Sequence, residues 1–521
     1  MAPNAAIQQQ PLFTGSDWDY RDIMRVYDAI ERIAVEELGL DTYPNQIEVI
    51  DSERMLDAYA SMGMPLFYRH WSFGKHFARD EMLYRKGYTG LAYEIVINSK
   101  PCISYIMEEN TLTMQTLVVA HAAFGHNHFF KNNRLFREWT DAEGILDYLD
   151  FAQGYIAECE ERYGVQAVEQ VLDAAHALMT QGVHRYPKPQ TRSLREERDR
   201  EIERIRYEEQ TYNDLWRTVP ADSEEEASSR GGVAPLEKRL QRLGLPEENL
   251  LYFLEKRAPR LEHWQREVLR IVRNVAQYFY PQKQTKVMNE GCATAVHYYI
   301  MNRLHEQGRL TDGAFLEFLH GHTSVVFQPE FDDPRYAGIN PYALGFAILE
   351  DLKRMATEPT EEDRRWFPEI AGCGDWVGVW HEAWREFRDE SFILQFLSPK
   401  VMREFRLFRV HDDAEEPELV VDAIHDDAGY RELRRSLARR HDIARLEPDL
   451  QVVDVDLDGD RTLVLEHRVA DGVTLEKHDA MAVLRHLANL WGYDVKLYEV
   501  APETGRVMNE YPAVSPQSPV A

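Results

Sequence analysis

The chain has 521 residues, 44 % hydrophobic and 11 % aromatic, which is enough for one large globular domain and a smaller second one. Its 60 basic and 89 acidic residues give a formal net charge of −29, which argues against nucleic acid and anionic membrane surfaces as partners. Four cysteines without a CxxC pair, no signal-peptide pattern and no apolar run of about 18 residues favour a cytoplasmic protein in a reducing compartment.

The first half of the chain is predicted to be mainly helical. Residues 1–15 read as a flexible tail, and the main domain is expected over residues 16–400. Its first helix is predicted from Asp17, which can cap it, to about Gly39, because apolar residues recur at helical spacing. Two short extended runs around a Ser-Lys-Pro turn are expected within residues 91–106, and helical patterns resume at Thr111.

A charged insertion is expected at residues 190–235. Its first part is charged nearly all round, which is typical of a solvated helix that serves as a spacer or a partner-binding arm. The acidic run at 221–233 reads as a flexible loop between two halves of the domain. Helices are then predicted, in order, at 247–280, 289–307, 312–321, 341–356 and 376–388.

The pattern changes near residue 405. Runs rich in β-branched residues, bounded by Asp and Gly, alternate with two amphipathic helical segments, and this pattern predicts a compact α+β module over residues 405–505. Residues 506–521 read as a flexible tail. The expected fold class is therefore α+β, with a large, predominantly α-helical N-terminal domain, for which a zincin-like architecture is a candidate, and a small C-terminal α+β module.

Three histidines within eight residues, His121, His126 and His128, form the strongest candidate for chemistry. Imidazole is a common ligand of zinc-type metals, and two histidines on one helix often supply half of a site. His121 and His126 are about 140° apart on an ideal α-helix, so they converge only if the helix bends, widens or ends at Gly125. The alternative interpretation is that one or two of them are core or surface histidines.

Glu290 and His297, seven residues apart on a predicted helix, form the second candidate pair. A glutamate in an apolar stretch is costly unless it is used, so Glu290 is predicted to be a metal ligand or a general base. The alternative is a glutamate that only favours the helix N-terminus. The same layout, a histidine pair and a later glutamate followed by Gly-x-Ala, occurs in zincin-type peptidases, although the HExxH glutamate is replaced by Ala122.

Another carboxylate would then have to act as the base. Glu94, Glu108 and Glu109 are the candidates near the histidines in sequence. Glu94 is flanked by apolar residues, and burial there would raise its pKa if no arginine pairs with it.

Several weaker features have structural alternatives. The segment His70–His76 could line a pocket or form an aromatic packing corner, and His320 and His322 could shape a turn. Cys292 has no helper at a diagnostic spacing, so cysteine catalysis is not favoured. The sequence contains no GxxxxGK[ST], GxGxxG or GxSxG motif.

Long motifs in the chain resemble the stage V sporulation protein R (SpoVR) family over about residues 16–505. The sequences that carry the resemblance are LDTYPNQIEVI (40–50), MGMPLFYRHWSFGKHF (62–77), GLAYEIVINSKPCISYIMEEN (90–110), HAAFGHNHFFKNN (121–133), MNEGCATAVHY (288–298), INPYALGF (339–346) and DESFILQFLSPKVMREFRLF (389–408). One departure is Cys292, where the family typically has tryptophan. The resemblance implies a cytoplasmic bacterial protein of spore cortex formation, or of stress and stationary phase.

The resemblance also implies two partners, a serine kinase with an AAA+ ATPase domain and a von Willebrand factor A-type protein. The leading hypothesis is a metal-dependent hydrolase-like centre for an amide bond. A divalent metal, with zinc as the first candidate, would be bound by His121, His126 and Glu290, and Glu94 and His297 would be catalytic or supporting residues. The alternative hypothesis is a non-enzymatic regulator that acts as an adaptor for the two partners.

Overall fold

The computed structural model describes residues 10–60, 68, 70, 71, 82, 94–185, 243–411, 420–423, 425–457 and 459–515. The chain divides into two compact units, the first of Met1–Glu169 and Gln277–Leu446 and the second of Gln170–Ala276 and Glu447–Ala521. The charged insertion predicted at 190–235 lies outside the described residues. Residues 405–446, which the sequence analysis assigned to the C-terminal module, are part of the first unit.

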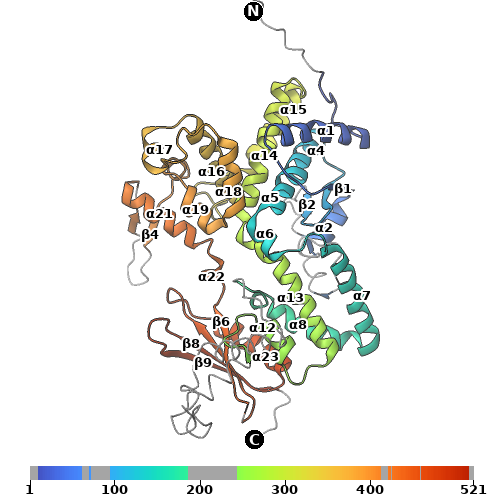
Figure 1. Cartoon of the computed structure of the whole chain (residues 1–521), viewed down its shortest axis with the longest axis vertical. Helices are drawn as coiled ribbons and strands as arrows, with labels where there is room; N and C mark the ends of the chain where they lie inside the picture. The colour runs from blue at the N-terminus through green and yellow to red at the C-terminus, as the bar shows by residue number, and fades with distance from the viewer. Residues whose placement is uncertain are drawn as a thin grey trace, which may run out of the picture. The chain divides into compact units, whose positions relative to one another are not determined.

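The first unit is built mainly from helices, which confirms the predicted α+β class with a predominantly helical N-terminal body (Figure 1). The zincin-like architecture stays a prediction. Its helices are α1 (Tyr20–Glu36), α2 (Ser52–Ala60), α4 (Leu112–Val119), η1 (Ala120–His126), α5 (Asn127–Asn132), α6 (Arg134–Trp139), α7 (Ile145–Tyr163), α14 (Lys286–Glu306), α15 (Asp312–Val325), α16 (Pro341–Thr357), α17 (Glu361–Trp366), α18 (Trp376–Glu386), α19 (Asp389–Phe396), α20 (Pro399–Glu404), α21 (Asp427–Arg439) and α22 (Ile443–Leu446). Helices α8 (Val165–Ala177) and α13 (His263–Gln284) cross the boundary between the units.

The start of α1 differs from the prediction. Asp19, not Asp17, is the N-cap, and its side chain accepts hydrogen bonds from the backbone N–H groups of Arg21 and Asp22. The Asp22 carboxylate in turn accepts a hydrogen bond from the Asp19 backbone N–H, which completes a capping box. This second bond needs a carboxylate three positions after the cap. Asp19 has Asp22 at that position, whereas Asp17 has Tyr20.

A three-stranded sheet lies in the first unit, with strand order β1-β3-β2. Strand β1 (Asn45–Ile50) runs parallel to β3 (Cys102–Met107), and β2 (Glu94–Ile97) pairs with β3 in the antiparallel direction. The two runs predicted around the Ser-Lys-Pro turn are therefore β2 and β3. A two-stranded ribbon of β4 (Arg409–His411) and β5 (Val420–Ala423) lies further along the chain.

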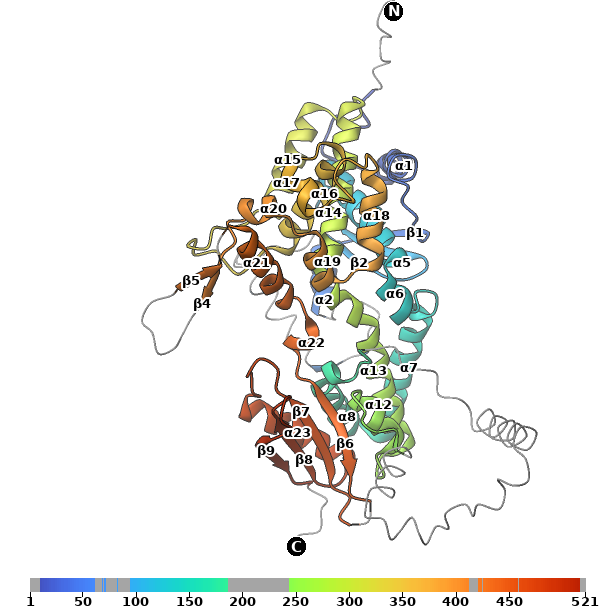
Figure 2. The same ribbon diagram turned by 60° about the vertical axis from the view of Figure 1, so that its left-hand side comes forward.

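Helix α14 passes through the hydrophobic core of the first unit and contacts η1, α1, α15, α16 and α19. Figure 2 shows α14 beside α16 and α18, with the three helices running in similar directions. Most of α14 is buried, including the apolar residues Met288, Ala295, Val296, Ile300 and Met301. Glu290, on the buried first half of this helix, therefore lies among helices, and its side chain is only 17 % exposed.

The second unit contains a four-stranded sheet of order β6-β7-β8-β9. Its elements are η2 (Met179–Gln181), α12 (Leu250–Arg257), β6 (Leu450–Val455), β7 (Leu463–Arg468), α23 (Lys477–Trp491), β8 (Val495–Val500) and β9 (Val507–Ala513). Strands β7 and β8 are parallel and are connected by α23, and β9 is antiparallel to β8.

Strand β9 falls in the segment that the sequence analysis assigned to a tail. Its first four residues are exposed, so it lacks the alternation of buried positions that marks β7 and β8. Pairing with β8 creates this strand, and a local sequence pattern does not reveal it. Among the described residues, no helix combines the length and apolar character needed to cross a membrane.

Candidate metal centre

The predicted histidine pair lies on a π-helical turn. Helix α4 runs into η1, a π-helix over Ala120–His126, and the chain returns to α-helical geometry in α5. At the end of η1 the Asn127 N–H bonds to the Ala122 carbonyl, five residues back. Because the turn is wider than in an α-helix, residues five apart come to the same side, and π-helical turns are frequent at functional sites. The ring centroids of His121 and His126 are 4.6 Å apart.

Small residues allow three helices to approach closely at this point. A Cβ added to Gly125 would lie 2.5 Å from the Cα of Ala293, so η1 packs directly against the backbone of α14. A Cβ added to Gly291 would lie 2.6 Å from the backbone of Gly345, which places α16 equally close on another side of α14. This close packing sets the positions from which Glu290 reaches toward the histidines.

Four side chains converge from β2, η1 and α14. The Nε2 atom of His121 lies 3.5 Å from Oε1 of Glu94 and 3.9 Å from Oε2 of Glu290. The Nε2 atom of His126 lies 3.6 Å from the same Glu290 oxygen. Glu94, His121 and His126 can each offer one ligand atom such that all three atoms lie within 4.8 Å of one another. The structure therefore brings together Glu94, His121, His126 and Glu290.

A neighbouring amide orients His126. Its Nδ1 lies 2.9 Å from Oδ1 of Asn289, the residue before Glu290. An amide oxygen only accepts, so Nδ1 carries the proton and Nε2 turns its lone pair toward the Glu290 carboxylate. Two acceptors 3.6 Å apart repel each other unless a cation lies between them. A ring N–H held by an oxygen acceptor is the usual support of a metal-bound histidine.

A chain of imidazoles orients His121. Its Nδ1 lies 2.9 Å from Nδ1 of His297, and Nε2 of His297 lies 3.0 Å from Nδ1 of His322. Neutral imidazole has one donor and one acceptor, so two sets of tautomers satisfy both bonds. The set that suits a metal has protons on His121 Nδ1 and His297 Nε2, because it leaves the lone pair of His121 Nε2 facing the carboxylates. His297 thus lies behind His121, away from the carboxylates. His322, which the sequence analysis interpreted as shaping a turn, extends this chain.

The pKa shifts at the site favour the neutral forms of Glu94, His121 and His297. Burial, followed by the charge of Glu290, raises the pKa of Glu94 to about 8. Burial also holds the pKa of His121 well below its usual value, and the nearby His126 and His297 lower it further. The pKa of His297 is lowered well below its usual value for the same main reason, burial. Neutral imidazoles with free lone pairs are the form that binds a metal.

Asp389 fixes the start of α14. Its carboxylate is buried and accepts hydrogen bonds from the N–H groups of Val287 and Met288, at 2.8 and 2.9 Å. Burial raises the pKa of Asp389 to about 7, although the two N–H bonds lower it. Thr285, at the N-cap, makes no side-chain capping bond, so Asp389 supplies the missing acceptor from α19. The sequence analysis did not identify this role.

The ligand-atom distances known at the site fit a metal of the zinc type: Glu94, His121 and His126 lie together, and Glu290 lies close to both histidines. Four ligands at about 2.0–2.2 Å from a tetrahedral ion lie about 3.3–3.6 Å from one another, close to the 3.5, 3.6 and 3.9 Å measured here. His121 Nε2 and Glu290 Oε2 are buried and have no hydrogen-bond partner among the residues that the structure describes. Such atoms are costly in a folded protein unless something binds them. Imidazole with carboxylate is also a ligand set that zinc accepts.

Other sequence candidates lie elsewhere. His128 faces away from the site, where its Nδ1 accepts a bond from the Asp41 N–H at 3.0 Å and its ring contacts His381. Glu109 accepts a bond from the Ser52 N–H, and Glu108 is exposed. Burial raises the pKa of the Cys292 thiol well above its usual value, which disfavours a thiolate nucleophile. Of the segment His70–His76, residues 72–76 lie outside the described chain.

Two family models together match nearly the whole chain. The model described as SpoVR like protein matches residues 17–446, and the SpoVR-like C-terminal domain matches residues 448–502. The chain belongs to the SpoVR family. A relative described as uncharacterized protein YcgB, from Escherichia coli strain K12, is 56 % identical over 487 residues, covering 93 % of each chain. No solved structure matches this SpoVR protein.

Proposed function

We propose that this SpoVR protein is a metal-dependent hydrolase of amide bonds, with a divalent ion bound by His121, His126 and Glu290. One observation carries the proposal: Nε2 of both histidines lies 3.6–3.9 Å from the same Glu290 oxygen, and with the tautomers assigned above their lone pairs repel that oxygen. A cation resolves that repulsion, and zinc is the first candidate. A zincin-like arrangement of the helices remains part of the proposal.

A bound ion of this kind would acidify a water molecule and polarise a carbonyl group. Glu94 is the residue placed to take the proton, because its oxygen lies 3.5 Å from His121 Nε2 and burial holds its pKa at about 8, near the working pH of a general base. His297 is a positioning residue, since it touches only the far side of the His121 ring. A peptide or a cell-wall precursor would supply the amide bond.

Metal content of the purified full-length protein tests the proposal directly. We expect close to one zinc-type ion per chain, lost in His121→Ala and Glu290→Gln. Glu306→Gln is the matched control, because Glu306 is an exposed glutamate on the same helix. His478→Ala tests the exposed group Glu476, His478 and Asp479 as a competing source of bound metal. Folded, metal-free protein after expression with ample zinc would refute the proposal.

The role of Glu94 is separable from metal binding. Glu94→Gln should keep the metal and lose hydrolysis, whereas Glu290→Gln should lose both. Hydrolysis would be followed with short peptides and peptide fragments of cell-wall precursors as substrates. If Glu94→Gln also releases the ion, Glu94 is a ligand and another group must act as the base.

Physiological roles follow only from family membership. Spore cortex formation, or stress and stationary-phase physiology, is the setting we propose, in the cytoplasm. The proposed partners are a serine kinase with an AAA+ ATPase domain and a von Willebrand factor A-type protein. A metal-free chain that still binds those partners would support the alternative function, a non-enzymatic adaptor.

A further inference from the structure

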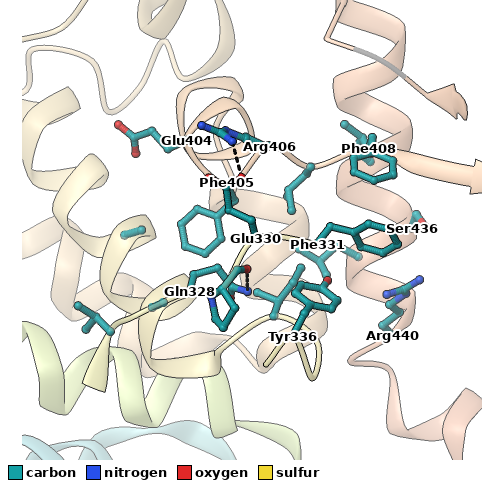
Figure 3. Close-up of a pocket in the computed structure, with 18 of the residues that line it drawn as sticks. Gln328, Glu330, Phe331, Tyr336, Glu404, Phe405, Arg406, Phe408, Ser436 and Arg440 are labelled. Atoms are coloured by element: carbon teal, nitrogen blue, oxygen red, sulfur yellow. Dashed lines mark hydrogen bonds and ion pairs between the residues drawn. The ribbon is translucent and has the colours of Figure 1, made fainter. Parts of the chain in front are cut away.

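A cavity of about 810 Å³ lies in the first unit (Figure 3). Its walls come from the loop after α15, from α16, from the segment after α20 and from α21. This volume lies within the range of about 300–1,000 Å³ typical of small-molecule sites. None of the four proposed metal-site residues lines it, so the cavity is a separate feature.

Aromatic side chains gather around this cavity and stay unusually exposed. The ring of Phe331 lies 5.4 Å from that of Tyr336 and 5.3 Å from that of Phe408. Phe331 is 61 % exposed and Phe408 is 42 % exposed. Leu433 and Leu437, one turn apart on α21, line the wall beside them. Contiguous exposed aromatic surface in a concave site indicates that an apolar ligand covers it.

Most charges at the cavity are already paired. Arg406 binds Glu330 at 2.7 Å, and Glu404 binds Lys400 at 2.5 Å. Arg406 also has a φ of 48°, in the left-handed region that residues other than glycine rarely adopt. Such strain is typical of binding sites, and here it accompanies an ion pair that ties the two wall segments together.

The polar side chains at one end of the cavity form no such pairs. Ser436 lies on the last turn of α21 and Arg440 is the C-cap residue of that helix, still in right-handed helical geometry, so the two share one face; Figure 3 shows both at one edge of the cavity. Within the described part of the chain, the Arg440 guanidinium and the hydroxyls of Ser436 and Tyr336 have no hydrogen-bond partner. Asp332 also lines the cavity, and both Asp332 and Arg440 are exposed to solvent, so a ligand can reach the Arg440 guanidinium from the open side of the cavity.

We propose that the cavity binds a small amphipathic monoanion, with an aromatic or branched apolar body among the phenylalanines and a carboxylate at Arg440 and Ser436. The planar guanidinium suits a carboxylate, which it can bind through two parallel hydrogen bonds. The single unpaired arginine, with Glu330, Glu404 and Asp332 nearby, disfavours a doubly charged phosphate. This site is independent of the proposed metal centre.

Calorimetric titration of the full-length protein tests the proposal with two probes, 2-naphthoate and its uncharged counterpart 2-naphthalenemethanol. We expect naphthoate to bind at least about tenfold more tightly than the alcohol. Arg440→Gln should weaken naphthoate binding about tenfold and leave the alcohol unchanged. Arg439→Gln is the matched control, because it removes the same charge from the neighbouring residue, which is exposed like Arg440 but does not line the cavity.

Variants that fill the cavity provide a second, independent test of the proposal. Ala347→Leu and, separately, Ser436→Phe add volume from opposite walls, α16 and α21, and each should weaken both probes. Two separate variants keep the test valid if one of them fails to fold. Equal effects of Arg440→Gln and Arg439→Gln, or no effect of cavity filling, would overturn the proposal. Absence of binding by either probe would also overturn it, and would favour a protein-docking role for the exposed aromatic surface.

Discussion

Gly125→Ala should damage the proposed metal centre without changing a proposed ligand. The new Cβ would lie 2.5 Å from the Cα of Ala293, whereas ordinary van der Waals separations begin at 3.4 Å, so η1 and α14 must separate by about 0.9 Å. His126 follows Gly125, so its Nε2 would move from 3.6 Å to about 4.5 Å from Glu290. A displacement near 1 Å can cost about 100-fold in a preorganised site. We expect metal affinity to fall about 10- to 100-fold, and stability to fall by about 1–3 kcal/mol from overpacking.

Competition with a chromogenic chelator would measure the affinity, and urea unfolding the stability. Gly154→Ala in α7 is the control, because Gly154 is exposed and nothing lies within 4 Å of its added Cβ. That variant should keep its metal and gain up to about 1 kcal/mol from helix propensity. Adding Ala293→Gly to Gly125→Ala should restore part of the affinity, since it removes the methyl group 2.9 Å away but leaves the overlap with the backbone of residue 293. Equal metal affinity in Gly125→Ala and Gly154→Ala would refute the packing argument.

Three further predictions follow from buried polar groups. His297→Gln should weaken metal binding about tenfold by releasing the His121 ring, as metal titration would show, while His305→Gln on the same helix should not. Asp389→Asn should lower the free energy of unfolding by about 1–3 kcal/mol, because its NH₂ group would face a backbone N–H of α14. Glu499→Gln should destabilise the second unit by a similar amount, because the buried carboxylate accepts bonds from the Leu475 N–H, Asn509 and Tyr511. Burial alone would raise the pKa of Glu499, but these donors hold it below its ordinary value, so its contribution to stability is present above about pH 4.3 and is lost as the pH falls below that. Urea unfolding across this pH range should show a flatter acid dependence in Glu499→Gln than in the exposed control Glu510→Gln; parallel curves would contradict it.

The sequence predicted the helical body and the convergence of the candidate site better than it predicted the details that support them. The runs of apolar residues bounded by helix-stop signals were enough to predict α14, α16 and α18, although α14 is buried nearly all round between Gly291 and His297. The five-residue spacing of His121 and His126 required a helix that bends, widens or ends at Gly125, and η1 is a widened turn. An apolar context singled out Glu94, and that residue lies beside His121.

The supporting interactions depend on the folded chain and have no local signal. Asp389 lies about a hundred residues from the backbone groups that it caps. Asn289 and His322 acquire their roles from rings on other helices, and only their partners distinguish them from surface polar residues. Strand β9 is similar, since pairing with β8 defines it although its own sequence is largely polar and exposed.

The close glycine packing around α14 affects how mutational data on SpoVR proteins should be interpreted. Gly125, Gly291 and Gly345 leave no room for even a methyl group, because each faces the backbone of a neighbouring helix. In a saturation screen for loss of function, these three positions should therefore be as intolerant of substitution as the histidines. Cysteine scanning across α14 would show the same pattern. Gly291 would not tolerate the substitution for steric reasons, and Glu290 would not because a proposed ligand is lost. Measuring soluble protein yield alongside bound metal for each failed variant would separate the two groups.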